Sequence, residues 1–307
     1  MYKIFREKEA YKFPANYAPN LFLSQQHREL QSSAWQSWYL VNCENAIIQA
    51  EIHLSLQKNT FINPVRAPFS SWYFHPELPA ELSFGFLKDV FDEIDGEISL
   101  TMPPSGYFSD QTELIRTFLK SCGFLPKVYN PHWLLEISGE EFDAQFRSAD
   151  ARRRLKNTWN EGFRFRMEEP GSGEEIYEFI EEHQVKKAFR MSMNREEFRR
   201  HLNQVGEEMV FSTLRKKNNI AAAFIGFRVY PDIIYDFMHS HDSNWSAFSP
   251  VIALINGLYQ WSQLNGIRVL DLGACSLEGK INLPLVRFKE SLGAQMSEKL
   301  TWIRPEK

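Results

Sequence analysis

The sequence predicts a mixed α/β protein built from two similar halves, each with a sheet that carries helices on both faces. Three observations support this prediction. Strand-forming and helix-forming segments follow one another in nearly the same order in residues 1–146 and 147–307. In the second half, an antiparallel run of strands leads into strand–helix–strand alternation, which is typical of a mixed sheet. The chain has 307 residues, 43% of them hydrophobic, which is enough for two domains of about 150 residues each.

Six elements are predicted in the first half from residue preferences and turn signals. Val, Ile, Tyr and Trp mark the strands, "NCEN" makes a turn between the first two, and Asp95-Gly96 ends the first helix. The elements are strands 37–41 and 46–56, helix 79–94, strand 97–102, helix 112–124 and a closing strand 129–137.

The second half repeats this order after a linking helix, a strand and two further helices. Pro250 stands at the first position of its longest helix with Ser249 as the cap, and Asn265-Gly266 ends that helix. The elements are helix 140–162, strand 163–169, helices 173–189 and 195–205, strands 207–217, 220–230 and 233–240, helix 250–265, strand 267–272, helix 284–293 and a closing strand 294–303.

Charge is spread unevenly along the chain. The net charge is −4, with −7 over residues 1–146, +3 over 147–217 and zero over 218–307. We therefore do not expect a polyanion-binding surface that extends over the whole molecule. The cluster Arg152, Arg153, Arg154 and Lys156 either contacts a phosphate or forms a solvated helix face.

Targeting and metal-binding signals are not seen in the sequence. It shows no run of about 18 apolar residues and no signal-peptide core at its start. The three cysteines are far apart and have no metal-ligand spacing. We therefore expect a cytoplasmic protein with no membrane span and no metal site.

The segment "VLDLGAC" (269–275) is similar to the Asp-x-Gly turn that opens the cofactor site of many methyltransferases. Such a site needs further strand–helix units after it, because nucleotides bind at the carboxyl ends of parallel strands. Only 34 residues follow Gly273, and Ala274-Cys275 replaces the second glycine that close approach to a nucleotide needs. We instead interpret the segment as a late strand whose Gly273 lets the chain turn away from the sheet, with Asp271 at the floor of a cleft.

The second half resembles the GNAT (acyl-CoA N-acyltransferase) fold, in which a strand meander leads to two splayed strands. The resemblance implies that the donor's pyrophosphate lies on the loop "HSHDSNWSAF" and the helix that begins at Ser249-Pro250, where amides and the helix dipole attract phosphate. It thereby implies donor-binding roles for four residues: His241, Asn244, Ser246 and Ser249. The Gly-rich pyrophosphate signature of simple GNAT enzymes is missing here.

Taken together, the tandem halves, the basic linking helix and the tail "DLGA…VRFKESLGA" resemble the FemAB-like group of double-GNAT proteins. That group includes aminoacyl-tRNA-dependent peptidoglycan bridge transferases and many bacterial proteins. The resemblance implies transfer of an acyl group from an activated carrier to an amine, with acyl-CoA or aminoacyl-tRNA as co-substrate and no permanently bound cofactor. It implies a small-molecule or peptidoglycan-precursor amine as acceptor; the charge distribution does not favour tRNA.

Residue roles follow from the same resemblance. The family's Phe-Lys pair falls on Phe288-Lys289, beside Arg287, with Phe288 and Arg287 facing substrate. Lys289 either stabilises the oxyanion of the acyl-transfer intermediate or is a lysine snorkelling from an amphipathic helix. Arg66 in "NPVRAPFS" lies in a segment that resembles the family's substrate-facing loop. There it either binds a phosphate or carboxylate through two hydrogen bonds, or contributes only to the solubility of the chain.

Strand 233–240 and its neighbour supply candidate bases. Tyr235 and His239 share one face by period two, and Asp236 lies on the other. Tyr235 is a candidate substrate-binding residue. His239 or His241 is a candidate general base, against the alternative of a structural histidine. Asp236 and Asp271 are each a candidate general base or a candidate helix cap.

Two functions of different classes are consistent with these features. The first is an N-acyltransferase with its acceptor held between the two halves. The second is a non-catalytic binding or scaffold protein that keeps the fold but has lost donor binding, as the missing Gly-rich signature suggests.

Overall fold

The computed structural model covers the 307-residue chain and describes residues 1–10, 12–15, 20–31, 33–108, 111–187, 189, 191–277 and 280–307. The chain forms two compact units. One consists of Met1–Pro131 with Ser297–Lys307, and the other of His132–Met296. In the described residues, no helix has the length and apolar character needed to cross a bilayer.

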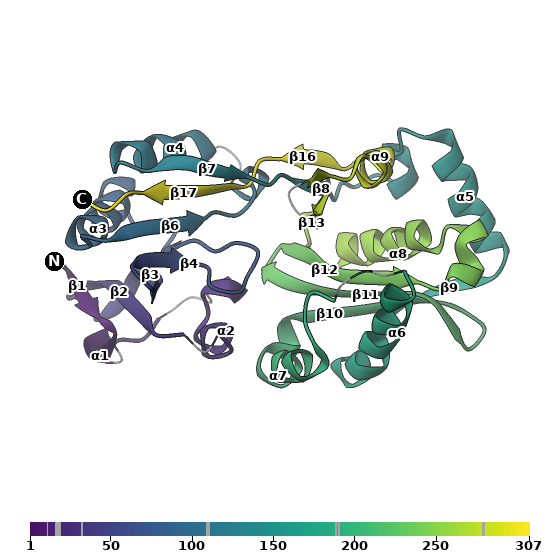
Figure 1. The fold of residues 1–307 in the computed structure, drawn as a ribbon, viewed down its shortest axis with the longest axis horizontal. Coiled ribbons are helices and arrows are strands. Elements are labelled where there is room, and N and C mark those ends of the chain that lie inside the picture. Colours follow the sequence, from purple (N-terminus) through teal and green to yellow (C-terminus); the bar gives the residue numbers. More distant parts are fainter. Residues whose placement is uncertain are drawn as a thin grey trace. The chain divides into compact units, whose positions relative to one another are not determined.

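The first unit contains a sheet of eight strands with the order β1-β2-β3-β4-β6-β17-β7, and β5 pairs with β3 (Figure 1). Its pairings are antiparallel except β4 with β6. The strands are β1 Tyr2–Arg6, β2 Trp35–Asn42, β3 Ile47–Gln57, β4 Thr60–Asn63, β5 Tyr73–Phe74, β6 Glu97–Thr101, β7 Leu125–Tyr129 and β17 Leu300–Arg304. The α-helices are α1 Glu7–Ala10, α2 Gln25–Glu29, α3 Ala80–Glu93 and α4 Thr112–Ser121.

The second unit is built on a sheet with the order β16-β8-β13-β12-β11-β10-β9. In it β12 and β13 are parallel, and the pairings of β13 with β8 and along β12-β11-β10-β9 are antiparallel. Its strands are β8 His132–Glu136, β9 Phe163–Glu168, β10 Met209–Lys216, β11 Asn219–Tyr230, β12 Ile233–His241, β13 Val269–Ala274 and β16 Gln295–Ser297. A small hairpin joins β14 Ser276–Leu277 to β15 Lys280–Ile281. The α-helices are α5 Ala149–Asn160, α6 Gly173–Val185, α7 Arg195–Val205, α8 Pro250–Leu264 and α9 Leu283–Ser291.

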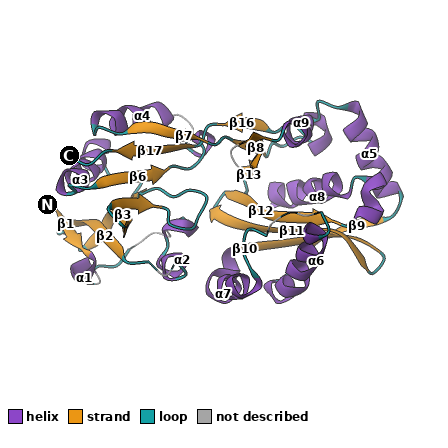
Figure 2. Cartoon of the chain, in the orientation of Figure 1, coloured by secondary structure: helices purple, strands orange, loops and turns teal. Residues whose placement is uncertain are grey.

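Helices cover both faces of this second sheet (Figure 2). Side chains along β10 alternate between the two faces, as a strand requires. Val210 and Leu214 join the core that α8 fills with Ile252, Leu254 and Leu258. Phe211, which follows Val210 on β10, points to the other face and packs against Gly173 at the start of α6. Predictions of a mixed α/β fold with helices on both faces are confirmed.

The closing strands of the two halves are exchanged. Segment 129–137 was expected to close the first half, but its strand β8 pairs with β13 in the second sheet. The end of segment 294–303 forms β17, which lies between β6 and β7 in the first sheet. The units therefore divide at residues 131/132 and 296/297, whereas the sequence repeat suggested a division at 146/147. Strand propensity describes each segment alone and does not specify which sheet it joins.

Candidate active site in the second unit

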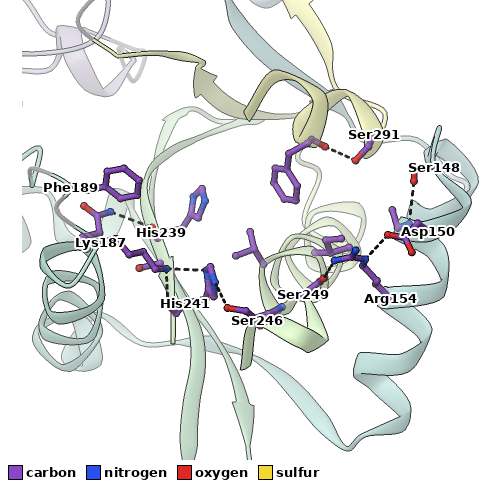
Figure 3. Close-up of a pocket in the computed structure, with 17 residues that line it drawn as sticks. Ser148, Asp150, Arg154, Lys187, Phe189, His239, His241, Ser246, Ser249 and Ser291 are labelled. Atoms are coloured by element: carbon purple, nitrogen blue, oxygen red, sulfur yellow. Dashed lines mark hydrogen bonds and ion pairs between the residues drawn. The ribbon is translucent and has the colours of Figure 1, made fainter. Parts of the chain in front are cut away.

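A cavity of about 520 Å³ opens in the second unit (Figure 3). Its walls come from α5, the end of α6, the carboxyl end of β12, the start of α8 and one side of α9. Between β12 and α8 runs a 3₁₀ segment, Ser243–Phe248. In the described part of the chain, no group of three or more His, Cys, Asp or Glu side chains is placed to hold a metal ion.

A β-bulge in β12 shapes the cavity wall. Ile225 of β11 pairs with Met238 and Gly226 pairs with Asp236, so Phe237 is left without a partner in the ladder. Gly226 suits this irregular site, because a Cβ there would come within 2.6 Å of the Phe224 ring. The extra residue shifts the alternation of side chains along the strand.

The bulge brings Asp236 and His239 together. Asp236 Oδ2 lies 2.7 Å from His239 Nδ1, although strict period-two alternation predicts opposite faces for the two residues. The Asp236 side chain is 7% exposed, whereas the His239 ring is 30% exposed and lines the cavity. A carboxylate at Nδ1 favours the tautomer with hydrogen on that nitrogen, which leaves Nε2 as the proton acceptor.

His241 and Lys187 lie together on the same side of the cavity (Figure 3). Lys187 Nζ donates to the carbonyl oxygen of His241 at 2.9 Å and lies 3.3 Å from its Nδ1. Burial, reinforced by the nearby Lys187 charge, lowers the pKa of His241 to about 4, so its ring is neutral at pH 7. Burial also lowers the pKa of Lys187. No local sequence pattern marks Lys187, which reaches the cavity only through the fold.

Arg154 of α5 lies across the cavity from this pair (Figure 3). Its guanidinium contacts Asp150 Oδ2 at 2.5 Å and donates to Ser249 Oγ at 3.2 Å. The rest of the basic cluster points elsewhere: Arg152 donates to the carbonyls of Asp143 and Phe146, and Arg153 is exposed. Arg153 therefore belongs to a solvated helix face, Arg154 lines the cavity, and contact of the cluster with a phosphate stays a prediction.

The loop expected to bind pyrophosphate uses many of its amides internally. The N–H of Asn244 donates to Asp242 Oδ1 at 2.9 Å, and the N–H of Ile252 donates to the Ser249 carbonyl at 3.0 Å. Pro250 has no N–H. Three of the four predicted donor-binding residues, His241, Ser246 and Ser249, line the cavity, and Asn244 does not. Ser249 is the N-cap residue of α8, as expected, but its side chain makes no capping bond, and its hydroxyl accepts a hydrogen bond from Arg154.

Lys289 is buried at 3% exposure, so the snorkelling alternative is wrong. Its ammonium donates to the carbonyls of Leu272, Gly273 and Ala274, at 3.0 Å for the last two. An ammonium has three N–H donors, and all three are used here. In this geometry Lys289 ties α9 to the end of β13. Its neighbour Phe288 lines the cavity, while Arg287 is exposed and does not.

Asp271 belongs to a separate buried cluster. Its carboxylate lies 2.7 Å from His132 Nδ1 and accepts the Gly273 N–H at 2.7 Å. Tyr235 stacks on His132 with 5.9 Å between ring centroids, and burial, with smaller contributions from Asp271 and Asp236, raises the pKa of the Tyr235 phenol. Asp271 is completely buried and does not line the cavity, so its predicted place at a cleft floor is wrong. Sequence reasoning missed His132, because its strand was assigned to the other half.

Two further residues singled out in the sequence are Gly273 and Arg66. Gly273 has φ of +74°, a conformation that favours glycine, as expected for a turn out of the sheet. Arg66 lies in the first unit, exposed in the loop that follows β4.

Comparisons with known proteins agree with this fold. Residues 144–280 match the model of the acetyltransferase (GNAT) domain. No curated protein sequence matches the chain significantly. Among solved structures, FemX is similar with a TM-score of 0.70 at 12% identity, over 94% of this chain and 93% of that one.

Two further structures share the arrangement. L-PGS from Bacillus licheniformis has a TM-score of 0.56 at 14% identity, over 94% of this chain and 88% of that one. A tandem GNAT protein from the clavulanic acid biosynthesis pathway has a TM-score of 0.50 at 11% identity, over 89% and 83%. The chain therefore has a FemX-like tandem GNAT fold, as the sequence resemblance predicted.

Proposed function

We propose that this tandem GNAT chain is an N-acyltransferase, which moves an acyl or aminoacyl group from an activated carrier to an amine, with the chemistry in the cavity of the second unit. The observation that carries the proposal is the Asp236–His239 pair, whose imidazole borders that cavity at the β12 bulge. The match of residues 144–280 to the acetyltransferase domain supports the same reaction class.

His239 acts as the general base. Its Nε2 takes a proton from the acceptor ammonium, and Asp236 holds the ring and stabilises the imidazolium that forms. The amine nitrogen then bonds to the acyl carbon, and the bond from that carbon to the carrier's sulfur or oxygen breaks. The second proton of the nitrogen goes to the departing sulfur or oxygen, and the proton held by His239 is released to solvent. The residues around the reacting atoms are expected to speed the reaction mainly by stabilising the charge that develops in the transition state, in a cavity partly shielded from water.

The donor is a CoA ester or an aminoacyl-tRNA. Arg154 and Lys187 supply cationic side chains, and Phe189 and Phe288 supply apolar surface. Because Asn244 and Ile252 have their amides occupied and Pro250 has none, we expect donor phosphates to be held mainly by side chains rather than by a glycine-rich turn. His241, Ser246 and Ser249 complete the donor side of the cavity.

The acceptor is a small-molecule amine or a peptidoglycan-precursor amine, as the resemblance to FemAB-like proteins implies. Arg66, Tyr235 and Arg287 stay predictions as acceptor-binding residues. Lys289 as an oxyanion-stabilising group would have to give up one of its three carbonyl partners during the reaction.

Mass spectrometry tests the proposal directly. The purified chain is incubated with acyl-CoA or charged-tRNA pools and a panel of amines, and new amides are identified by mass. We expect product with the wild type and little with His239→Ala. No product from any pair, together with no thermal stabilisation by any donor, would instead favour the scaffold alternative, since a bound ligand raises stability by mass action.

A further inference from the structure

A second cavity, of about 280 Å³, lies wholly within the first unit. Its lining residues come from α1 and the residues after it, from α2 and the residue Leu23 before it, and from strands β2 and β3. Figure 1 labels these helices and strands. Phe13, Leu23 and Ile48 give it apolar walls. Its volume is just under the roughly 300–1,000 Å³ range of drug-sized ligand pockets, so it suits a small molecule.

Two opposite charges line this cavity and are both buried. Arg28 is 8% exposed and Glu51 is 7% exposed. In the described part of the chain, no ion pair joins them: the guanidinium of Arg28 donates to the Leu23 carbonyl, and the Glu51 carboxylate lies 3.6 Å from His53 Nε2. Buried charges without a counter-charge are costly, so proteins usually pair them or use them to bind ligands.

His53 does not neutralise Glu51. The ring is completely buried, which lowers the pKa of His53, so it is uncharged at pH 7. Among the described residues, neither of its ring nitrogens has a hydrogen-bond partner. Tyr39 packs edge-on against this ring, at 5.5 Å between centroids, and lines the cavity. Burial raises the pKa of Tyr39 to about 12, so the phenol keeps its proton and remains a donor.

We propose that this cavity binds a small zwitterion of the α-amino acid class, with its carboxylate on Arg28 and its ammonium on Glu51. Arginine suits the carboxylate because its guanidinium offers a planar pair of donors. Half-buried Glu7 on α1 adds a second carboxylate to the wall and favours the cationic end of the ligand. The apolar walls accommodate a short side chain. This site is separate from the acyl-transfer cavity and does not depend on it.

Binding to the full chain, with no acyl donor present, tests this inference. Isothermal titration and thermal shift compare glycine, alanine, valine and lysine with two probes of single charge, acetate and methylammonium, at equal concentration and ionic strength. We expect at least one amino acid to raise the melting temperature, and the single-charge probes to leave it unchanged. Hydrogen exchange should slow in residues 20–31 and 37–52 when that amino acid binds.

Charge-removing variants identify the cavity as the site. Glu51→Gln and Arg28→Gln are each expected to weaken binding at least tenfold, while Glu77→Gln, an exposed change in the same unit, leaves it intact. Without ligand, Glu51→Gln should unfold at the same or a higher urea concentration than the wild type, because it removes a buried charge. Should a variant fail to fold, the wild-type titration and exchange data decide.

The inference is overturned if none of the amino acids binds, if acetate or methylammonium binds equally well, or if protection appears outside the cavity segments. Because no donor is used, failure of acyl transfer in the second unit would not affect this result.

Discussion

Asp236 Oδ2 lies 2.7 Å from His239 Nδ1 because Phe237 bulges out of the β11–β12 ladder and turns both side chains to the same side. The relation between these two residues depends on one extra residue in a strand. It gives the second unit a histidine with a fixed tautomer beside a cavity.

Replacing the proposed base, His239, should slow the reaction strongly. We expect His239→Ala to lower kcat roughly a hundred- to ten-thousand-fold, the usual contribution of a general base. Asp236→Asn should also lower kcat and alter the pH profile, because its amide no longer stabilises the imidazolium. His201→Ala, which removes an imidazole of α7 that does not line the cavity, is the control. Equal rates for His239→Ala and the control would remove His239 from the mechanism.

Arg154 and Arg153 form a matched pair for testing donor binding. Both contact Asp150, but only Arg154 lines the cavity. We expect Arg154→Gln to raise the KM for the donor roughly tenfold, as loss of about 1.5 kcal/mol from a charge-assisted hydrogen bond implies. Arg153→Gln should leave KM unchanged. Steady-state kinetics with varied donor concentration measures both, and a similar effect of the two variants would point to long-range charge instead.

Lys289→Met should destabilise the chain. The substitution keeps much of the side-chain volume but leaves the carbonyls of Leu272, Gly273 and Ala274 without their buried donor. We expect a loss of roughly 1–3 kcal/mol in the free energy of unfolding, measured by urea denaturation. A fall in kcat with unchanged stability would contradict the structural role and favour the oxyanion role.

The stability of the fold should depend on His241 at mildly acidic pH. Its pKa is about 4 in the folded chain, below the ordinary 6.5, so the unfolded state binds more protons between these values. The contribution of His241 is therefore fully present above pH 6.5 and is lost as pH falls to about 4. In urea titrations at pH 7, 5.5 and 4.5, His241→Gln should lose less stability than the wild type. If the wild type and His241→Gln lose equal free energy of unfolding as the pH falls, burial and the Lys187 charge do not lower the pKa of His241.

Much of the fold was predictable because local patterns determine it. The predicted helix 195–205 coincides with α7, and helix 250–265 agrees with α8 to one residue, since a capping signal or a Pro start and an apolar period mark their limits. Strands β1, β4 and β7 were missed, as were the two-residue strands β5, β14 and β15. All residues of β7 are exposed, so it lacks the alternation that reveals a half-buried strand.

The site was only partly predictable, because its geometry depends on contacts distant in sequence. Asp236 and His239 were both candidates, but no local signal revealed the bulge that pairs them. Lys289 belongs to a motif that was recognised, yet its three carbonyl partners lie 15 to 17 residues earlier in the chain. His132 meets Asp271 across 139 residues, through a strand exchange that the sequence repeat conceals.

The exchanged strands tie the order of synthesis to the order of assembly. Strands β6 and β7 emerge from the ribosome long before β17, which must lie between them, and the whole second unit is made in the interval. The first sheet therefore cannot close while residues 1–131 are being translated and must wait until Leu300–Arg304 have been made. A stop codon a few residues before Leu300 would accordingly damage the half of the protein that was translated first.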